Sequence, residues 1–233
     1  MATLLSPFDS NPKTAKNTKQ GWGTAVLHLA PAGMSGFQVC QGRSAGCEAA
    51  CLHFAGSPVY QKGKNSSRIR RTQMFFRERD QFMIELVKEM KAHIRKCERM
   101  DLKPAARLNA TSDLPWERIR CGDASNIMEL FPEVQFYDYT AVLGRKIPDN
   151  YHLTFSLKED NTDKARLALE QGMNVTAVFP DDNFPDKFWG LPVIDGDEHD
   201  FRPSDPAPCI IGLKVKGKLG KADETGFVQR NFE

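Results

Sequence analysis

The fold class is decided by VQFYDY at Val134–Tyr139, YHLTFS at Tyr151–Ser156, TDKARLALEQ at Thr162–Gln171 and NVTAVF at Asn174–Phe179. The first, second and fourth segments have the short apolar density of strands, and the third predicts a helix that ends at Gly172. A strand, a helix and another strand in succession imply parallel pairing. We therefore expect an α/β protein, either a partial parallel barrel or an open parallel sheet with helical crossovers.

The same alternation extends to both sides of this region. The further strands that we expect are Thr24–Leu29, Ala105–Ala110, Leu191–Ile194, Cys209–Val215 and Gly226–Val228, and a short helix is expected over Asp123–Phe131. A long helix is predicted over Gln73–Cys97, where apolar residues recur at spacings of three, four and seven. The polar, basic segment 61–71 before it has the composition of a mobile loop. We predict a single α/β domain over residues 21–233, preceded by a polar arm at residues 1–20 that is ordered only if something holds it.

The length, composition and net charge of the chain exclude several classes of protein. The chain has 233 residues, 40% of them hydrophobic, which is enough for a buried core. Lys and Arg number 32 against 30 Asp and Glu, a net charge of +2 that excludes binding to nucleic acid by bulk charge alone. Neither an apolar run of membrane-spanning length nor a secretory signal is recognisable, so we expect a soluble cytosolic protein without a membrane partner.

Hydroxyl, amide and carboxylate side chains follow the predicted strands. In a parallel α/β fold these positions meet at one edge, where ligand sites form. The candidate catalytic residues are Asp113, Tyr137, Asp138 and Asp197, and the candidate cofactor-binding residues are Asn109, Ser112 and Asp113. Each of these residues taken alone is equally typical of a helix cap or a turn, so the pattern indicates a face of the protein and not a reaction.

Three cysteines lie close together in the loop at residues 40–51, after the first long strand. Cys40, Cys47 and Cys51 are separated by six and then three residues, and Gly42 and Gly46 lie among them. Thiolates on such a loop are typical ligands of an iron–sulfur cluster, either 4Fe-4S or 3Fe-4S. The alternatives are a zinc site that adds His53 and simple buried thiols. The scattered Cys97, Cys121 and Cys209 are expected to pack in the core.

Several long motifs resemble a known family. They are CQGRSAGC at 40–47 with Cys51-Leu52, RIRRT at 68–72, RLN at 107–109, SDLPW at 112–116, FYDYT at 136–140 and DGD at 195–197. This set is similar to the gene-product-eighty-eight family of uncharacterised bacteriophage proteins, and the similarity extends from Asn11 to about Val228. The resemblance implies a phage origin and a location in the host cytoplasm.

The layout also resembles that of radical S-adenosylmethionine enzymes, which place three cysteines in a loop after the first strand of a partial barrel. Their spacing is three residues and then two, and a Gly-Gly-Glu segment follows their second strand; here Asn109–Asp113 occupies the comparable place. Three functions stay open. They are an iron–sulfur protein of redox or reductive chemistry with a small-molecule substrate or electron donor, a radical enzyme that uses S-adenosylmethionine, and a zinc-stabilised protein that binds nucleic acid through Lys62–Arg79.

Overall fold

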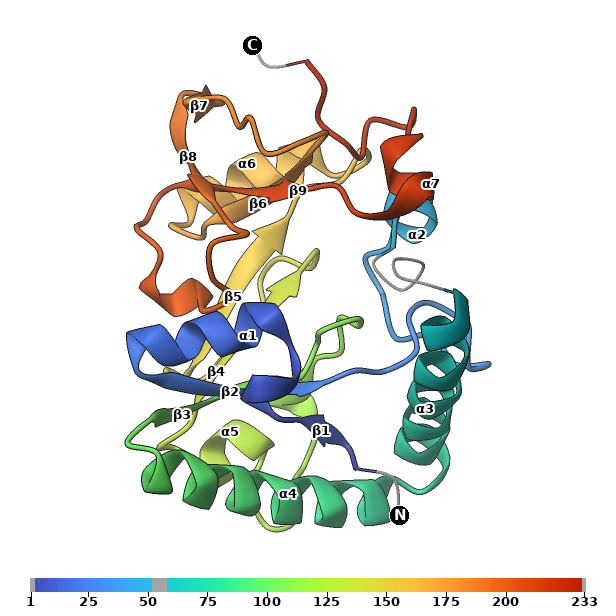
Figure 1. The fold of residues 1–233 in the computed structure, drawn as a ribbon, viewed down its shortest axis with the longest axis vertical. Helices are drawn as coiled ribbons and strands as arrows, with labels where there is room; N and C mark the ends of the chain where they lie inside the picture. The colour runs from blue at the N-terminus through green and yellow to red at the C-terminus, as the bar shows by residue number, and fades with distance from the viewer. Residues whose placement is uncertain (1–2, 52–57, 232–233) are drawn as a thin grey trace.

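One curved sheet organises the molecule (Figure 1). The computed structural model describes residues 3–51 and 58–231. The strands are β1 (Leu5–Ser6), β2 (Trp22–Leu27), β3 (Lys103–Arg107), β4 (Gln135–Thr140), β5 (Tyr151–Ser156), β6 (Val175–Phe179), β7 (Lys187–Phe188), β8 (Leu191–Asp195) and β9 (Ile210–Lys214). They form a nine-stranded sheet in the order β1-β2-β3-β4-β5-β6-β9-β8-β7.

The pairing is mostly parallel, as the alternation of strands and helices predicts. Every pair from β2 to β8 along this order is parallel, and only the short β1 and β7 at the two ends pair antiparallel. The two end strands are not joined, so the sheet is open and does not close into a barrel. The expected α/β class is confirmed, in its open-sheet form.

The crossovers between parallel strands carry most of the helices. These are α1 (Pro12–Asn17), α2 (Ala45–Ala49), α3 (Pro58–Arg77), α4 (Arg79–Arg99), α5 (Ile127–Leu130), α6 (Thr162–Glu170) and α7 (Gly217–Lys221). Local chemistry fixes several ends: the side chains of Asn11, Ser44 and Asn126 cap the first turns of α1, α2 and α5. Gly172, at a φ of 81°, allows the chain to leave α6 in the left-handed region.

The N-terminal segment predicted to be an arm is held against the sheet. β1 pairs with β2, and α1 lies over β2 (Figure 1). The backbone N–H groups of Leu4 and Leu5 donate to the carboxylate of Glu89 at 2.8 and 2.7 Å. Phe8 is 2% exposed. Buried apolar side chains and paired backbone groups therefore order residues 3–20.

The prediction of a loop at residues 61–71 is wrong, because these residues belong to α3. A separate helix, α4, follows it, and Glu78 between them leaves the helical region with φ −133° and ψ 50°. Lys, Arg and Gln are good helix formers even where no apolar stripe reveals them, so charge alone was a poor guide to a loop. Two smaller differences are that α5 spans only Ile127–Leu130 and that the expected strand at 226–228 is a single bridge between Val178 and Val228.

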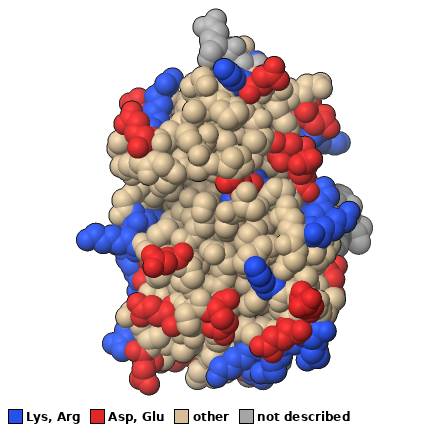
Figure 2. All heavy atoms as spheres, turned by 90° about the vertical axis from the view of Figure 1, so that its left-hand side faces the viewer, with Lys and Arg blue, Asp and Glu red and all other residues tan. Residues whose placement is uncertain are grey.

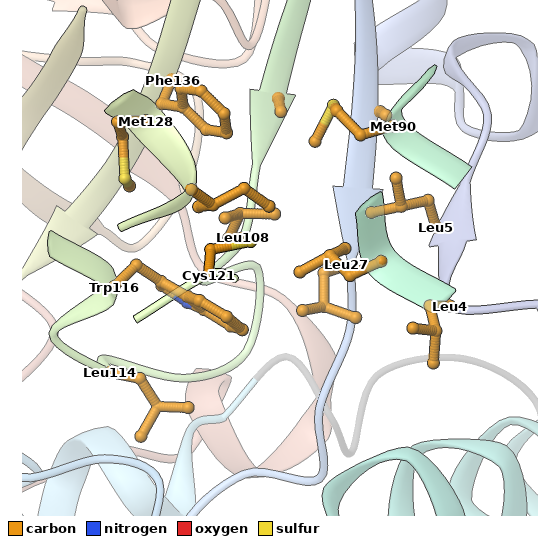
Figure 3. Packing of buried hydrophobic residues seen from close by; sticks show 14 of the residues in the cluster. Leu4, Leu5, Leu27, Met90, Leu108, Leu114, Trp116, Cys121, Met128 and Phe136 are labelled. Carbon is orange, nitrogen blue, oxygen red and sulfur yellow. The ribbon is translucent and has the colours of Figure 1, made fainter. Parts of the chain in front are cut away.

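The two faces of the sheet are covered differently. One face packs against α3, α4 and α5 in the largest apolar core, part of which appears in Figure 3. The other face, under α1 and the segment at residues 196–205, buries many polar groups: Thr24, Tyr137, Asp200 and Arg202 are each at most 4% exposed. Apolar packing therefore stabilises one face, and a hydrogen-bonded network lies on the other.

No helix within the described ranges has both the length and the apolar character to cross a membrane. On the face seen in Figure 2, basic and acidic side chains are interspersed.

Candidate functional site

A pocket of about 260 Å³ lies at the carboxyl ends of the central parallel strands. Its polar wall comes from residues that follow or end β3, β4 and β5, among them Arg107, Asn109–Asp113, Tyr139, Ser156 and Lys158. Its apolar wall includes Val178, Leu213, Val215 and Phe227. Cys40, Cys47 and Cys51 all line this same pocket. The cysteine loop and the strand ends thus meet at one edge, as the parallel topology requires.

The first half of the cysteine loop is tied to the end of β3. The backbone N–H of Asp113 donates to the carbonyl of Val39 at 2.8 Å, next to a parallel bridge between Cys40 and Asp113. The Asp113 carboxylate accepts from the Ala141 N–H at 2.9 Å and the Thr140 hydroxyl at 3.2 Å, and it pairs with Arg145 at 3.2 Å. Asp113 therefore joins the loop, β3 and β4 through bonds that occupy both of its oxygens.

The second half of the loop is tied to Glu159, just after β5. One Glu159 oxygen accepts from the Gly46 N–H and the other from the Ser44 hydroxyl, each at 2.6 Å. Gly46 is required here because an added Cβ would lie 2.1 Å from the Thr225 hydroxyl oxygen and 2.7 Å from the Cβ of Phe227. Cys47, on α2, is thereby held at a fixed position on the pocket wall.

The three thiols are close enough to influence one another. Burial raises the pKa of Cys40 to about 11; an N–H from Ala32 at 3.4 Å opposes the shift, and Cys51 and Cys47 add to it. Burial also raises the pKa of Cys47, against the opposing charge of Lys158. Without a metal these two thiols are therefore protonated near neutral pH, and a metal that binds them has to displace protons.

Lys158 is a buried cation beside Cys47. It is 7% exposed, its ammonium donates to the carbonyl of Gly42, and its positive charge opposes the rise in the pKa of Cys47. No carboxylate of the described residues lies within ion-pair distance of it. A buried charge without a counter-ion is costly, so this position favours an anionic partner such as a thiolate.

Asn109 and Ser112 line the pocket, but their side chains are engaged within their own loop. The Asn109 amide oxygen accepts from the Ser112 hydroxyl at 2.8 Å, the Leu114 N–H at 2.9 Å and the Trp116 indole at 3.2 Å. Its NH₂ group donates to the Leu114 carbonyl at 2.9 Å. These bonds shape the loop and leave the Asn109 side chain little capacity for a ligand.

Tyr137 and Asp138 lie below the pocket and do not line it. The Asp138 carboxylate accepts from the N–H groups of Leu108 and Asn109 and from the Tyr151 hydroxyl. Burial raises the pKa of Asp138 to about 7, although nearby Arg107 and these donors oppose the shift. The Tyr137 hydroxyl donates to Asp200 at 3.0 Å. Both residues brace the strand ends from inside the fold.

Asp197 lies at the rim of the pocket, where α1 meets the end of β9. Its carboxylate pairs with Lys13 at 2.6 Å and Lys216 at 3.4 Å and accepts from the Lys214 N–H at 3.0 Å. These cations and the N–H lower the pKa of Asp197 against the effect of burial. At neutral pH the Asp197 carboxylate is therefore ionised and holds three segments together.

Arg107 is a pocket residue that the sequence reasoning did not single out. It ends β3, its Nη1 donates to Asp200 at 2.9 Å, and its guanidinium lies 4.7 Å from the centre of the Tyr139 ring. The available signal was a charge inside the apolar run 105–108, where burial requires a partner. Lys158 had a weaker signal, its position two residues after a predicted strand.

The other cysteines lie away from the pocket. Cys121 is fully buried beside Trp116 in the apolar core (Figure 3). Cys97 contacts His93 on α4, and Cys209 precedes β9. His53, the fourth ligand of the zinc alternative, lies outside the described residues. Within the described ranges, no three His, Cys, Asp or Glu side chains converge tightly enough to hold a single metal ion.

The fold and the site define an α/β protein with an open parallel sheet and a cysteine-lined pocket at the carboxyl ends of its strands. A model of the family described as gene product 88 matches residues 3–231, so the chain belongs to that family. This confirms the bacteriophage family that the motifs predict. No curated protein and no solved structure matches the chain, and nothing in these comparisons supports the resemblance to radical S-adenosylmethionine enzymes.

Proposed function

We propose that the protein binds an iron–sulfur cluster through Cys40, Cys47 and Cys51 and acts in redox or reductive chemistry on a small molecule in the adjoining pocket. The observation that carries the proposal is that three cysteines from one short loop line one pocket at the carboxyl ends of parallel strands. Such an edge is where α/β proteins bind ligands.

The donor set suits a cluster better than a single ion. Three thiols without a tightly convergent geometry do not form a ready zinc site. The thiolate ligands of a cluster bind different irons, so they are spread around it. The Ala32 N–H beside Cys40 and the ammonium beside Cys47 are the kinds of donor that stabilise anionic sulfur.

The chain's own residues have separable tasks in this proposal. Asp113 and Glu159 fix the two halves of the cysteine loop, and Lys158 balances negative charge on Cys47. The surrounding apolar wall limits access of water. A bound cluster would supply one-electron transfer, and a cluster held by three cysteines has a coordination position open to a small ligand.

The test is anaerobic purification or reconstitution, followed by iron and sulfide analysis of single-cysteine variants. Cys40→Ala, Cys47→Ala and Cys51→Ala should each abolish or sharply reduce bound iron and sulfide. Cys97→Ala is the matched control, because that thiol is buried away from the pocket, and it should retain the wild-type iron content.

Full iron content in Cys47→Ala would contradict the assignment. A colourless protein that contains stoichiometric zinc instead of iron would contradict the cluster while supporting a metal at the same cysteines. Electron paramagnetic resonance before and after exposure to air then distinguishes a three-iron from a four-iron cluster.

A further inference from the structure

The charges that line the pocket are strongly unequal. Six basic residues contribute to the wall and two acidic ones, an excess of four positive charges. The basic residues are Lys13, Arg43, Arg107, Lys158, Lys214 and Lys216, and the acidic ones are Asp113 and Asp197. Some of the cations are paired with carboxylates next to the pocket, so the number alone does not define a ligand. The positions of unused hydrogen-bond donors are more specific.

Arg107 has donors that the fold does not use. Its hydrogen bonds to the described residues all come from Nη1, to Asp200. Nε is buried without a hydrogen-bond partner, and its nearest charged neighbour is an Asp138 oxygen at 3.9 Å. Nη2 also makes no hydrogen bond within the described ranges. Because a guanidinium presents paired N–H groups, these donors match the two oxygens of a carboxylate or a phosphate.

Tyr139 is next to Arg107 and lies on the adjacent strand. Its ring is in contact with the Arg107 guanidinium, and it lines the pocket. Its hydroxyl forms no hydrogen bond with any residue that the structure describes. A half-buried hydroxyl beside a cation is well suited to donate to an anion.

The electrostatic environment nearby agrees with this arrangement. Burial lowers the pKa of His28, just after β2, to about 3, and the charges that lower it further are all cations, Arg68 and Arg107 foremost. Burial disfavours a charge of either sign here, but the excess of nearby cations favours a negative charge over a further positive one. The apolar wall formed by Val178, Leu213 and Phe227 adds a surface for a hydrocarbon body.

We infer that the pocket binds a small organic anion, whose carboxylate or phosphate group contacts Arg107 and Tyr139 and whose apolar body lies along Val178, Leu213 and Phe227. As a statement about the substrate, this rests on the proposed function. As a statement about binding, it concerns the chain's own side chains and is tested with or without iron.

Calorimetric titration of the full chain with three probes that share a phenyl ring tests the inference. The probes are phenylacetate, its neutral amide phenylacetamide, and phenyl phosphate. We expect at least one of the two anions to bind roughly tenfold or more tightly than the amide, because charge-assisted hydrogen bonds are about twice as strong as neutral ones. Comparison of the two anions identifies which acidic group fits.

Variants locate the binding. Arg107→Gln should remove the preference for the anions over the amide, and Arg107→Lys should retain part of that preference. Tyr139→Phe should weaken binding of the anions and leave the affinity for the amide unchanged. Arg118→Gln, at a side chain 71% exposed, is the control and should bind as wild type. If Arg107→Gln fails to fold, Tyr139→Phe and Arg107→Lys carry the test.

Equal binding of the amide and both anions, no binding of either anion, or anion binding unchanged in Arg107→Gln and Tyr139→Phe would overturn the inference. Each titration is performed on iron-free and reconstituted protein, and iron content is measured separately. Anion binding by iron-free protein supports this inference, and the iron content of the cysteine variants then tests the cluster separately. A protein that contains iron but binds neither anion refutes only this inference.

Discussion

The two faces of the sheet differ in what they bury. The face under α3 and α4 buries aromatic side chains: the Phe75 ring contacts the rings of Phe82 and Trp116, each at a centroid distance of 5.3 Å. The face under α1 buries an ionic and hydroxyl network around Arg107 and Asp200. Apolar burial is favourable in itself, whereas buried polar groups contribute little net stability unless they are fully paired.

The comparison indicates where function lies. On the face under α3 and α4 the buried residues have one evident role, which is to exclude water from the core. On the other face the hydrogen-bonded network includes Arg107, whose unused donors lie in the same pocket as the three cysteines. A protein that keeps incompletely satisfied polar groups in a pocket typically uses them for a ligand.

The largest effect that we expect comes from truncating the apolar face. Phe82→Ala removes a fully buried ring and should lower the free energy of unfolding by about 3–5 kcal/mol. Chemical denaturation measures it. Ile84→Ala, on the same helix but 60% exposed, is the control and should change stability by less than about 0.5 kcal/mol.

A more selective effect is expected at the cysteine loop. Gly46→Ala places a Cβ against Thr225 and Phe227, so the loop has to shift, at a cost of about 1–3 kcal/mol. Bound iron per folded chain should fall, while Phe82→Ala should leave it unchanged at a temperature where that variant is folded.

Gly63→Ala is the matched control. A Cβ at this helical position meets nothing within 4 Å, and alanine should stabilise α3 by roughly 1 kcal/mol. Equal loss of iron in Phe82→Ala and Gly46→Ala would show that the two faces are not separable.

The effect that is smallest per step of the measurement, here per pH unit, is a pH dependence that arises on the polar side. Burial raises the pKa of Asp138 to about 7 in the folded protein, above that of an unfolded aspartate. Between about pH 4 and pH 7 the folded state keeps this proton and the unfolded state has lost it, so stability from this group declines as pH rises, with a slope of at most about 1.4 kcal/mol per pH unit.

Asp138→Asn should flatten that decline in denaturation curves measured from pH 4 to pH 7. The exposed Asp149→Asn is the control and should keep the wild-type slope. An unchanged slope in Asp138→Asn would show that nearby Arg107 and Arg145 keep the carboxylate ionised throughout this range.

The strands were largely predictable because their apolar runs are dense and short. Val134–Tyr139 and Tyr151–Ser156 become neighbouring parallel strands, and the expected helix between Tyr151–Ser156 and Asn174–Phe179 forms. The part of α3 that precedes residue 73 was not predictable from periodicity, because its sequence is rich in charged and polar residues. The end of α3, residues 73–77 with the buried Phe75, was predicted as part of the helix over Gln73–Cys97. The helical state of the polar residues before it depends on their propensity, which apolar periodicity does not show.

The site was predictable in its topology and less so in its side-chain roles. Parallel order was enough to bring Cys40 beside Asp113. It could not show that the Asn109 amide would be used within its own loop, or that Asp138 would point below the pocket, because the strand twist and loop path set those directions. Arg107 emerged only when its burial and its unused donors could be seen, and Lys158 only when its burial could be seen without a carboxylate partner among the described residues.

The walls of the pocket come from distant parts of the chain, from Lys13 near one end of the described region to Phe227 near the other. The segment that contains Phe227 is held against β6 by a hydrogen bond from the Gln229 N–H to the Val178 carbonyl at 2.7 Å. During synthesis on the ribosome, the cysteine loop therefore emerges long before its opposing wall exists. The pocket is therefore complete only after residue 229 has been synthesised and this part of the chain has folded back onto β6, so the topology sets the order in which the walls of the pocket form.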